Sequence, residues 1–214
     1  MERCVFRDQC KEGLEEAAVQ WLRECREGLK RLVESEDLMT ASVFKWKRNF
    51  FIYYECIKRH FTPEELFPGA GRFLEVWPGE DEKRCWVPMM DIYHCAEPVS
   101  KEFWTRKQPV QRTCARLTRL KPEMVSSYIF YHFQYQEEKP GDWSKYPLIS
   151  LHENLMFFYT EEPDAPCEVP YKGRLSTSNT PGRWGDVMFP HFMLWDDTPK
   201  EEEIWRHIDL IYNL

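Results

Sequence analysis

Hydrophobic residues recur at helical spacing in two stretches of the chain. In residues 12–33 an apolar side chain returns every three or four positions among many charges, which predicts an amphipathic helix. A second helix is predicted over residues 122–138. Pro122 is tolerated in a first helical turn, and Glu123 is favourable near the positive end of the helix dipole.

Other apolar runs have the length and alternation of strands. Residues 112–120 alternate between two faces, and residues 146–162 predict a strand, a turn at His152-Glu153-Asn154 and a second strand. Residues 44–55 predict either one strand or two strands joined at Lys47-Arg48-Asn49. Two weaker candidates are a short strand over residues 72–79, stopped by Pro-Gly, and an apolar stretch of ambiguous type over residues 85–94.

The two halves of the chain repeat one order of elements. Each has a long helix, then two apolar runs separated by a polar turn, and then a Pro-Gly stretch followed by Trp, Met and Pro. We interpret this order as an internal duplication of a β-α-β-β-α unit of about 100 residues. The predicted fold class is therefore α+β: two tandem ferredoxin-like units, residues 1–105 and 112–214, packed sheet to sheet as an α/β barrel.

Composition and charge restrict the partners. The 29 Lys and Arg residues against 36 Asp and Glu give a formal charge of -7, which discourages binding to nucleic acid or an anionic membrane. No stretch reaches the about 18 apolar residues of a membrane span, so a cytoplasmic location is expected. A chain with both units would cover its own sheet faces, which predicts a monomer, or a dimer through a non-sheet surface.

Eight cysteines are scattered through a chain that is large enough to need no disulfide framework, and no CxxC occurs. We therefore expect reduced thiols in the core. Neither His94 with Cys95 nor any other group shows the spacing of metal ligands, so no metal site is predicted. GAGR at residues 69–72 lacks the Lys-Ser/Thr that follows in a phosphate-binding loop.

The segment SSYIFYHFQYQEE, residues 126–138, concentrates Tyr and His within two helical turns. Tyr128 and His132 stand four residues apart on one helix face, with Tyr131 and Tyr135 close beside them. Either this face is packed core with its polar tips bonded to the backbone, or it lines a pocket. In a pocket, His132 could act as a general acid or base, because an ordinary imidazole titrates near neutral pH.

Four segments in a fixed order resemble the L-rhamnose mutarotase family. They are ARLTRLKPEMVSSYIFYH, YPLISLHENLMFFYTEE, TPGRWGDVMFPHF and the terminal EIWRHIDLIYNL, and the resemblance covers roughly residues 112–214. Members of this family are small ferredoxin-like proteins that dimerise through their sheets. The resemblance implies that the chain interconverts anomers of a free monosaccharide such as L-rhamnose, with no cofactor and no metal.

The resemblance also implies roles for individual residues. Tyr128 and His132 would act on the sugar, while Tyr146, Trp184 and Arg183 would line or close its pocket. The corresponding helix of the first half carries other residues in their place: Ala17, Ala18, Trp21 and Leu22. We therefore expect one site per chain.

Two alternatives remain open at this point. The first is a non-catalytic small-molecule binding protein of the dimeric α/β barrel class, whose aromatic pocket holds a hydrophobic or sugar-like ligand. The second is a heme-binding or oxygenase-like protein of the same class that uses His132 as an axial ligand.

Overall fold

The chain folds into two compact units. The computed structural model describes residues 1–78, 83–168 and 172–214. Unit 1 comprises Met1–Met89, Pro98–Lys107 and Ile208–Leu214, and unit 2 comprises Met90–Glu97 and Gln108–His207. The predicted boundaries, residues 1–105 and 112–214, differ from these units at two segments, because residues 90–97 lie in unit 2 and residues 208–214 lie in unit 1.

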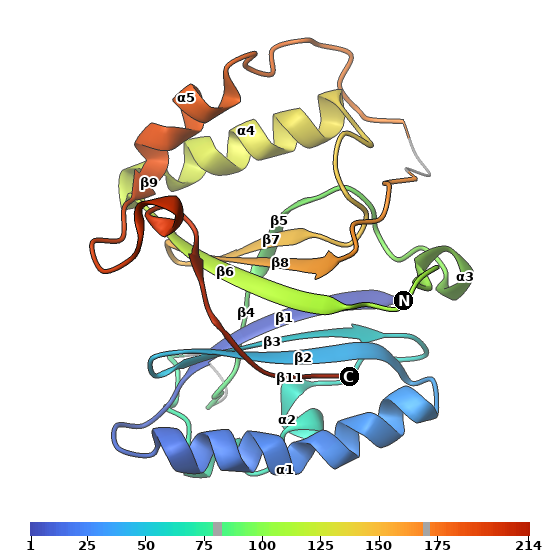
Figure 1. Ribbon diagram of the computed structural model, residues 1–214, viewed down its shortest axis with the longest axis vertical. Helices are drawn as coiled ribbons and strands as arrows, with labels where there is room; N and C mark the ends of the chain where they lie inside the picture. Colours follow the sequence, from blue (N-terminus) through green and yellow to red (C-terminus); the bar gives the residue numbers. More distant parts are fainter. Residues whose placement is uncertain (79–82, 169–171) are drawn as a thin grey trace. The chain divides into compact units, whose positions relative to one another are not determined.

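Unit 1 is an antiparallel sheet with one long helix on one face (Figure 1). The strand order is β11-β2-β3-β1-β4. Helix α1 lies along the sheet because Ala18, Trp21, Leu22 and Leu29 form its buried stripe. The elements of unit 1 are β1 (Glu2–Gln9), α1 (Glu15–Glu34), β2 (Leu38–Trp46), β3 (Asn49–Cys56), α2 (Pro63–Leu66), η1 (Ala70–Arg72), β4 (Val87–Pro88), α3 (Lys101–Trp104) and β11 (Asp209–Asn213).

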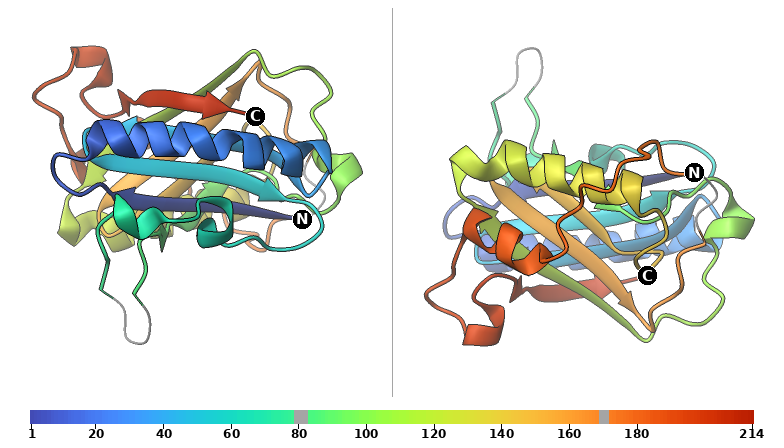
Figure 2. Two further views of the ribbon diagram at one scale, coloured as in Figure 1. Left: turned by 90° about the horizontal axis from the view of Figure 1, so that it is seen from below. Right: turned by 90° about the horizontal axis from the view of Figure 1, so that it is seen from above.

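Unit 2 is a second antiparallel sheet, crossed on one face by helix α4 (Figure 2, right). The strand order is β10-β6-β8-β7-β5, and the short β9 also pairs with β6. The elements of unit 2 are β5 (Met90–His94), β6 (Arg112–Leu120), η2 (Pro122–Met124), α4 (Val125–Glu138), β7 (Leu148–His152), β8 (Leu155–Glu162), α5 (Trp184–Met188), η3 (Phe189–His191), β9 (Phe192–Met193), η4 (Lys200–Glu202) and β10 (Arg206–His207).

Both units follow the same path through their sheets. In unit 1 the segment β1-α1-β2-β3 gives the spatial order β2-β3-β1, and in unit 2 the segment β6-α4-β7-β8 gives β7-β8-β6. The turns between the paired strands are also alike, since Lys47 and Glu153 both have a positive φ, of 53° and 57°. The edge strand β11 of the unit 1 sheet comes after the strands of unit 2 in the sequence. In the same way, the edge strand β5 of the unit 2 sheet comes after β1–β4 of unit 1.

Most predicted elements are confirmed, and one is wrong. The helices over residues 12–33 and 122–138 and the strand over residues 112–120 are present, and residues 44–55 fall in two strands, β2 and β3. The expected strand over residues 72–79 is absent from its described residues, where Leu74 and Trp77 make only isolated bridges. Its last residue, Gly79, lies outside the described residues.

One pair of cysteines corrects the expectation of reduced thiols. Cys95 and Cys167 form a disulfide, with Cα atoms 6.3 Å apart and a sequence separation of 72. The fold of unit 2 brings the residue after β5 next to the segment that follows β8, and sequence spacing carries no sign of that approach. The other six cysteines are free thiols.

Within the described part of the chain, no helix is both long and apolar enough to cross a membrane.

Candidate ligand-binding cavity

A row of directly paired residues crosses the sheet of unit 2. Along it, His207 is opposite Arg116, Arg116 opposite Phe158, Phe158 opposite Ile149, and Ile149 opposite Tyr93. Residues directly opposite each other on neighbouring strands point to the same face of a sheet. Ile149, Tyr93 and Phe158 belong to the apolar cluster that includes residues of α4, so this row lies on the face that α4 covers.

Helix α4 contributes Tyr128 and His132 from the opposite side. Their rings stack with centroids 4.0 Å apart, as expected for residues four apart on one helix face. Both are buried, at 2% and 4% exposure, whereas Phe130 and Phe133 on another face of α4 are 60% and 44% exposed. The sequence left open whether this face of α4 is packed core or lines a pocket. The space in front of the Tyr128 and His132 rings decides between the two.

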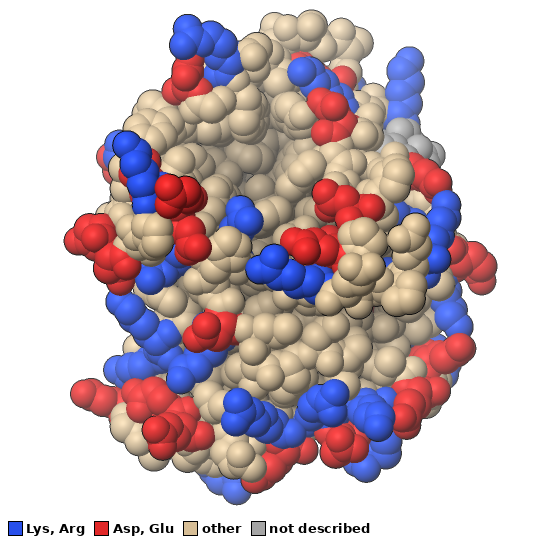
Figure 3. Space-filling model, viewed as in Figure 1, with Lys and Arg blue, Asp and Glu red and all other residues tan. Residues whose placement is uncertain are grey.

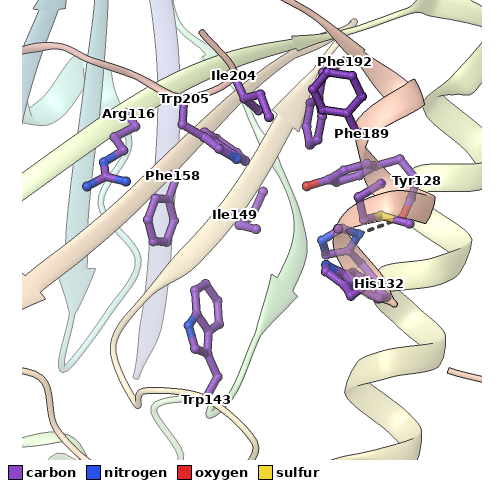
Figure 4. A pocket seen from close by; sticks show the side chains of 13 residues that line it. Arg116, Tyr128, His132, Trp143, Ile149, Phe158, Phe189, Phe192, Ile204 and Trp205 are labelled. Atoms are coloured by element: carbon purple, nitrogen blue, oxygen red, sulfur yellow. Dashed lines mark hydrogen bonds between the residues drawn. The ribbon is translucent and has the colours of Figure 1, made fainter. Parts of the chain in front are cut away.

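That space is a cavity of about 430 Å³. It is visible as a tan hollow below α4 and α5 with charged side chains around it (Figure 3), and in close-up with its lining side chains (Figure 4). A neighbouring cavity of about 350 Å³ shares four lining residues with it. The first cavity is lined by Arg116, Tyr128, His132, Trp143, Ile149, Phe158, Trp184, Gly185, Met188, Phe189, Phe192, Ile204 and Trp205.

The imidazole of His132 is held in one tautomer. Its Nδ1 lies 2.9 Å from the backbone carbonyl oxygen of Tyr128, and a carbonyl oxygen only accepts, so Nδ1 carries the hydrogen. Burial lowers the pKa of His132 to about 4, against an opposing effect of the bond to Tyr128. At neutral pH the ring is therefore uncharged, and Nε2 keeps a lone pair that no group in the described residues uses.

The hydroxyl of Tyr128 is a second polar group with no protein partner in the described part of the chain. Burial raises the pKa of Tyr128, so the phenol stays protonated. Its oxygen points toward Ile149 across the cavity (Figure 4). An unpaired hydroxyl in an apolar environment costs about 1–3 kcal/mol, so a ligand oxygen or a water molecule at this position would stabilise the site.

Arg116 is the ionised side chain of the cavity. Its Nε donates to Nε2 of His207 over 3.0 Å, and Nδ1 of His207 in turn lies 2.9 Å from a carboxylate oxygen of Glu202. The backbone and side-chain bonds from His207 hold the pKa of Glu202 below its ordinary value. This chain fixes the guanidinium through Nε alone, and its two terminal nitrogens have no partner among the residues that the structure describes.

The outer wall of the cavity depends on a carboxylate at the end of α4. The oxygens of Glu138 accept from the hydroxyl of Thr177 at 2.5 Å, the backbone N–H of Asn179 at 3.0 Å and the backbone N–H of Thr180 at 2.7 Å. Burial alone would raise the pKa of Glu138, but these bonds hold it well below its ordinary value. The segment fixed in this way leads directly into Trp184, the first residue of α5.

The structure brings together three of the five predicted site residues. Tyr128, His132 and Trp184 line one cavity, and the Trp184 ring meets the His132 ring edge-on at 5.0 Å. Tyr146, in the segment before β7, is buried but does not line this cavity. Arg183 is 88% exposed and pairs with Asp186, so it points to solvent and not to the cavity.

The sequence did not predict the residues on the side of the cavity that faces Tyr128 and His132. Arg116, Phe158, Trp143 and Trp205 come from strands and loops far apart in sequence. The alternation of β6 placed Arg116 on a defined face, but nothing in the sequence showed which face α4 would cover.

Comparison with known proteins identifies no family for this chain and one similar solved structure. No protein-family model matches the chain, and no curated protein matches its sequence. Among solved structures, a proposed monooxygenase from Fusobacterium nucleatum is similar over 99% of this chain and 92% of that chain, at 8% identity and a TM-score of 0.41. Membership of the L-rhamnose mutarotase family therefore stays a prediction.

The expected sugar mutarotase activity is corrected. The similar structure from Fusobacterium nucleatum is described as a proposed monooxygenase and not as a mutarotase. The cavity agrees poorly with a sugar, because its lining is mainly aromatic and aliphatic. A pyranose carries hydroxyl groups around its ring, and burying them without hydrogen-bond partners is costly.

Proposed function

We propose that unit 2 binds a small amphipathic acid with a flat apolar body and one anionic group. The observation that carries this proposal is the guanidinium of Arg116, held through Nε and open at both terminal nitrogens, in a cavity lined mainly by apolar side chains. A guanidinium with two free N–H groups matches the two oxygens of a carboxylate. The side chains of Phe158, Trp143 and Trp205 would pack against the apolar body of the ligand.

The far end of the ligand would meet Tyr128 and His132. Figure 4 shows Arg116 on one side of the cavity and these two residues on the other. The Tyr128 hydroxyl can donate and the Nε2 of His132 can accept, so together they suit a hydroxyl or carbonyl group on the ligand. The proposed ligand is thus anionic at one end, apolar in the middle and weakly polar at the other end.

Binding is favoured over acid–base catalysis by the state of His132. An efficient general base has a pKa near the working pH, and burial lowers the pKa of His132 to about 4. Such an imidazole accepts hydrogen bonds but takes up a proton weakly. The heme-binding alternative stays a prediction, and visible absorption by the purified protein would test it.

A matched pair of ligands tests the proposed function. 1-Naphthoate and 1-naphthylmethanol have the same ring system, but only the first is an anion. Binding of either one can be followed by quenching of tryptophan fluorescence, because Trp143, Trp184 and Trp205 line the cavity. We expect 1-naphthoate to bind more tightly, and we expect Arg116→Gln to remove that preference, weakening the naphthoate about tenfold or more while leaving the alcohol unchanged.

Arg112→Gln is the matched control variant. Arg112 lies on the same strand but is exposed, and its ion pair is with Glu162. It should leave both affinities unchanged. Equal binding of the acid and the alcohol by the native protein, or equal loss of naphthoate binding in both variants, would refute the assignment of Arg116.

We also propose that the two units are tandem ferredoxin-like domains packed sheet to sheet. Three features support this: the shared order of strand, helix, strand and strand, the equivalent turns at Lys47 and Glu153, and the edge strands exchanged between units. A sheet with helices on one face needs cover on the other. Analytical ultracentrifugation tests the accompanying prediction of a monomer, or of a dimer through a non-sheet surface, and a crystal structure tests the packing.

A further inference from the structure

Several metal-ligating side chains meet in unit 1, where β1 begins and β3 ends. In the register of these strands, Glu2 is opposite Cys56 and Cys4 is opposite Tyr54. Directly opposite residues, and residues two apart on one strand, share a face. Glu2, Cys4 and Cys56 therefore lie on one face, and both cysteines belong to the core cluster on the α1 side.

His60 completes the group from the segment after β3. Its Nδ1 lies 2.9 Å from a carboxylate oxygen of Glu2. Ligand atoms of Glu2, Cys4 and His60 all lie within 4.8 Å of one another. The thiol of Cys56 lies on the same sheet face as Cys4, but it is outside this group of three.

We propose that Glu2, Cys4 and His60 form a site for Zn²⁺, with the fourth position taken by water or by the neighbouring thiol of Cys56. Zinc prefers four ligands drawn from thiolate, imidazole, carboxylate and water, and one sulfur, one nitrogen and one oxygen with a fourth ligand fit that preference. Zinc–ligand bonds of about 2.0–2.3 Å place the donors of a tetrahedral site roughly 3.3–3.8 Å apart. The ligand atoms of Glu2, Cys4 and His60 lie within 4.8 Å of one another, so no pair has to close by more than about 1.5 Å to reach that spacing.

The burial of the four residues shows which of them would move. Cys4 and Cys56 are 5% and 1% exposed and are held by the core. The side chains of His60 and Glu2 are 46% and 54% exposed, so they can rotate onto a metal without disturbing the packing. A bound ion would tie the first residues of β1 to the segment that connects β3 with α2.

Cobalt is the probe for this site, because tetrahedral Co²⁺ with thiolate ligands gives visible bands and a sulfur-to-metal charge-transfer band. The full chain, freed of metal with EDTA and kept under an inert atmosphere so that the Cys95–Cys167 disulfide stays intact, is titrated with Co²⁺ and then with Zn²⁺. We expect both kinds of band to appear, to saturate at one ion per chain and to be lost when Zn²⁺ displaces Co²⁺. A featureless spectrum would overturn the proposal.

Substitutions then identify the ligands. Cys4→Ala should abolish or strongly reduce the charge-transfer band, whereas Cys25→Ala, which removes a partly buried thiol elsewhere in the same unit, should leave it unchanged. His60→Asn changes an exposed residue and should still fold, so it decides the question if Cys4→Ala does not fold. We expect it to weaken Zn²⁺ at least about tenfold, and unchanged affinity in His60→Asn would overturn the assignment.

Discussion

His132 donates its Nδ1–H to the backbone carbonyl oxygen of Tyr128 over 2.9 Å, and this bond decides which nitrogen of the ring faces a ligand. The bond joins residues four apart on α4, so it follows from helix geometry and requires no partner from another element. The same spacing stacks the two rings. Nε2 is left as the acceptor, and the chemistry of this end of the cavity is set within one turn of helix.

The neutral state of His132 makes stability depend on pH. Its pKa is lowered to about 4 in the folded protein, below the ordinary value of 6.5. As pH falls from about 6.5 to about 4, the unfolded chain takes up a proton that the folded protein resists. The stability contributed by this group is therefore present above about pH 6.5 and lost toward pH 4, and its size is on the order of 3 kcal/mol.

Urea unfolding at about pH 7 and about pH 4.5 measures this loss. Many carboxylates titrate in the same range, so the informative quantity is the difference between the native protein and His132→Gln. We expect His132→Gln to lose less stability on acidification than the native protein. An equal loss in His132→Gln would show that His132 is not held neutral by burial.

Tyr128→Phe separates a ligand-binding hydroxyl from a structural one. Its hydroxyl has no partner among the described residues, so we expect its removal to leave the free energy of unfolding unchanged or slightly higher. In Tyr128→Phe, binding of 1-naphthoate should be unchanged, because this ligand has no polar group at the end away from its carboxylate. Binding of a naphthoate with a hydroxyl group at that far end should weaken by about twofold to tenfold.

Tyr159→Phe is the control for that substitution. The Tyr159 hydroxyl donates to a carboxylate oxygen of Glu161 over 2.8 Å in the core, and its removal should cost about 1–3 kcal/mol. Thermal or urea unfolding of both variants gives the comparison. A loss of stability in Tyr128→Phe as large as that in Tyr159→Phe would mean that the Tyr128 hydroxyl is structural.

Helix and strand periodicity predicted most of the fold, and the reason is local. The stripe of Ala18, Trp21, Leu22 and Leu29 on α1 and the alternation of β6 are properties of contiguous residues. The disulfide between Cys95 and Cys167 and the edge strands β5 and β11 depend on how distant segments pair, and no local pattern encodes that pairing.

The candidate site was predictable on one wall only. Tyr128 and His132 share a helix face, so their spacing alone placed them together. Arg116 reaches the same cavity because the strand register sets it opposite Phe158, which is opposite Ile149. A shift of one residue in that register would turn all three side chains to the other face, and the sequence does not fix the register.

Glu138 positions the wall of the cavity without touching a ligand. In Glu138→Gln the side chain keeps its shape but loses its charge and one acceptor oxygen, so the bonds from Thr177, Asn179 and Thr180 should weaken. We expect faster hydrogen exchange in residues 172–183 and weaker 1-naphthoate binding. Glu123→Gln, an exposed change at the start of the same helix region, is the control and should alter neither. Unchanged exchange in Glu138→Gln would show that other contacts hold this segment.

A buried ion pair in unit 1 gives the last prediction. Two nitrogens of Arg106 donate to the two oxygens of Glu55 at 2.5 and 2.7 Å, and Tyr53 also donates to this carboxylate. The Glu55 side chain is fully buried and the Arg106 side chain is 12% exposed. Burial alone would raise the pKa of Glu55, but the charge and hydrogen bonds of Arg106 hold it below its ordinary value.

Removing one partner of such a pair is costlier than removing both, because the remaining charge stays buried without compensation. We expect Arg106→Met to lower the free energy of unfolding by about 3–5 kcal/mol at neutral pH. Adding Glu55→Gln to that variant should restore part of the loss.

The penalty in Arg106→Met should also shrink as pH falls, because the unpaired carboxyl of Glu55 then has a raised pKa and is neutralised by a proton. A double-mutant cycle by urea unfolding measures the coupling, and purely additive losses would show that the pair contributes little to holding the segment Pro98–Lys107 on β3.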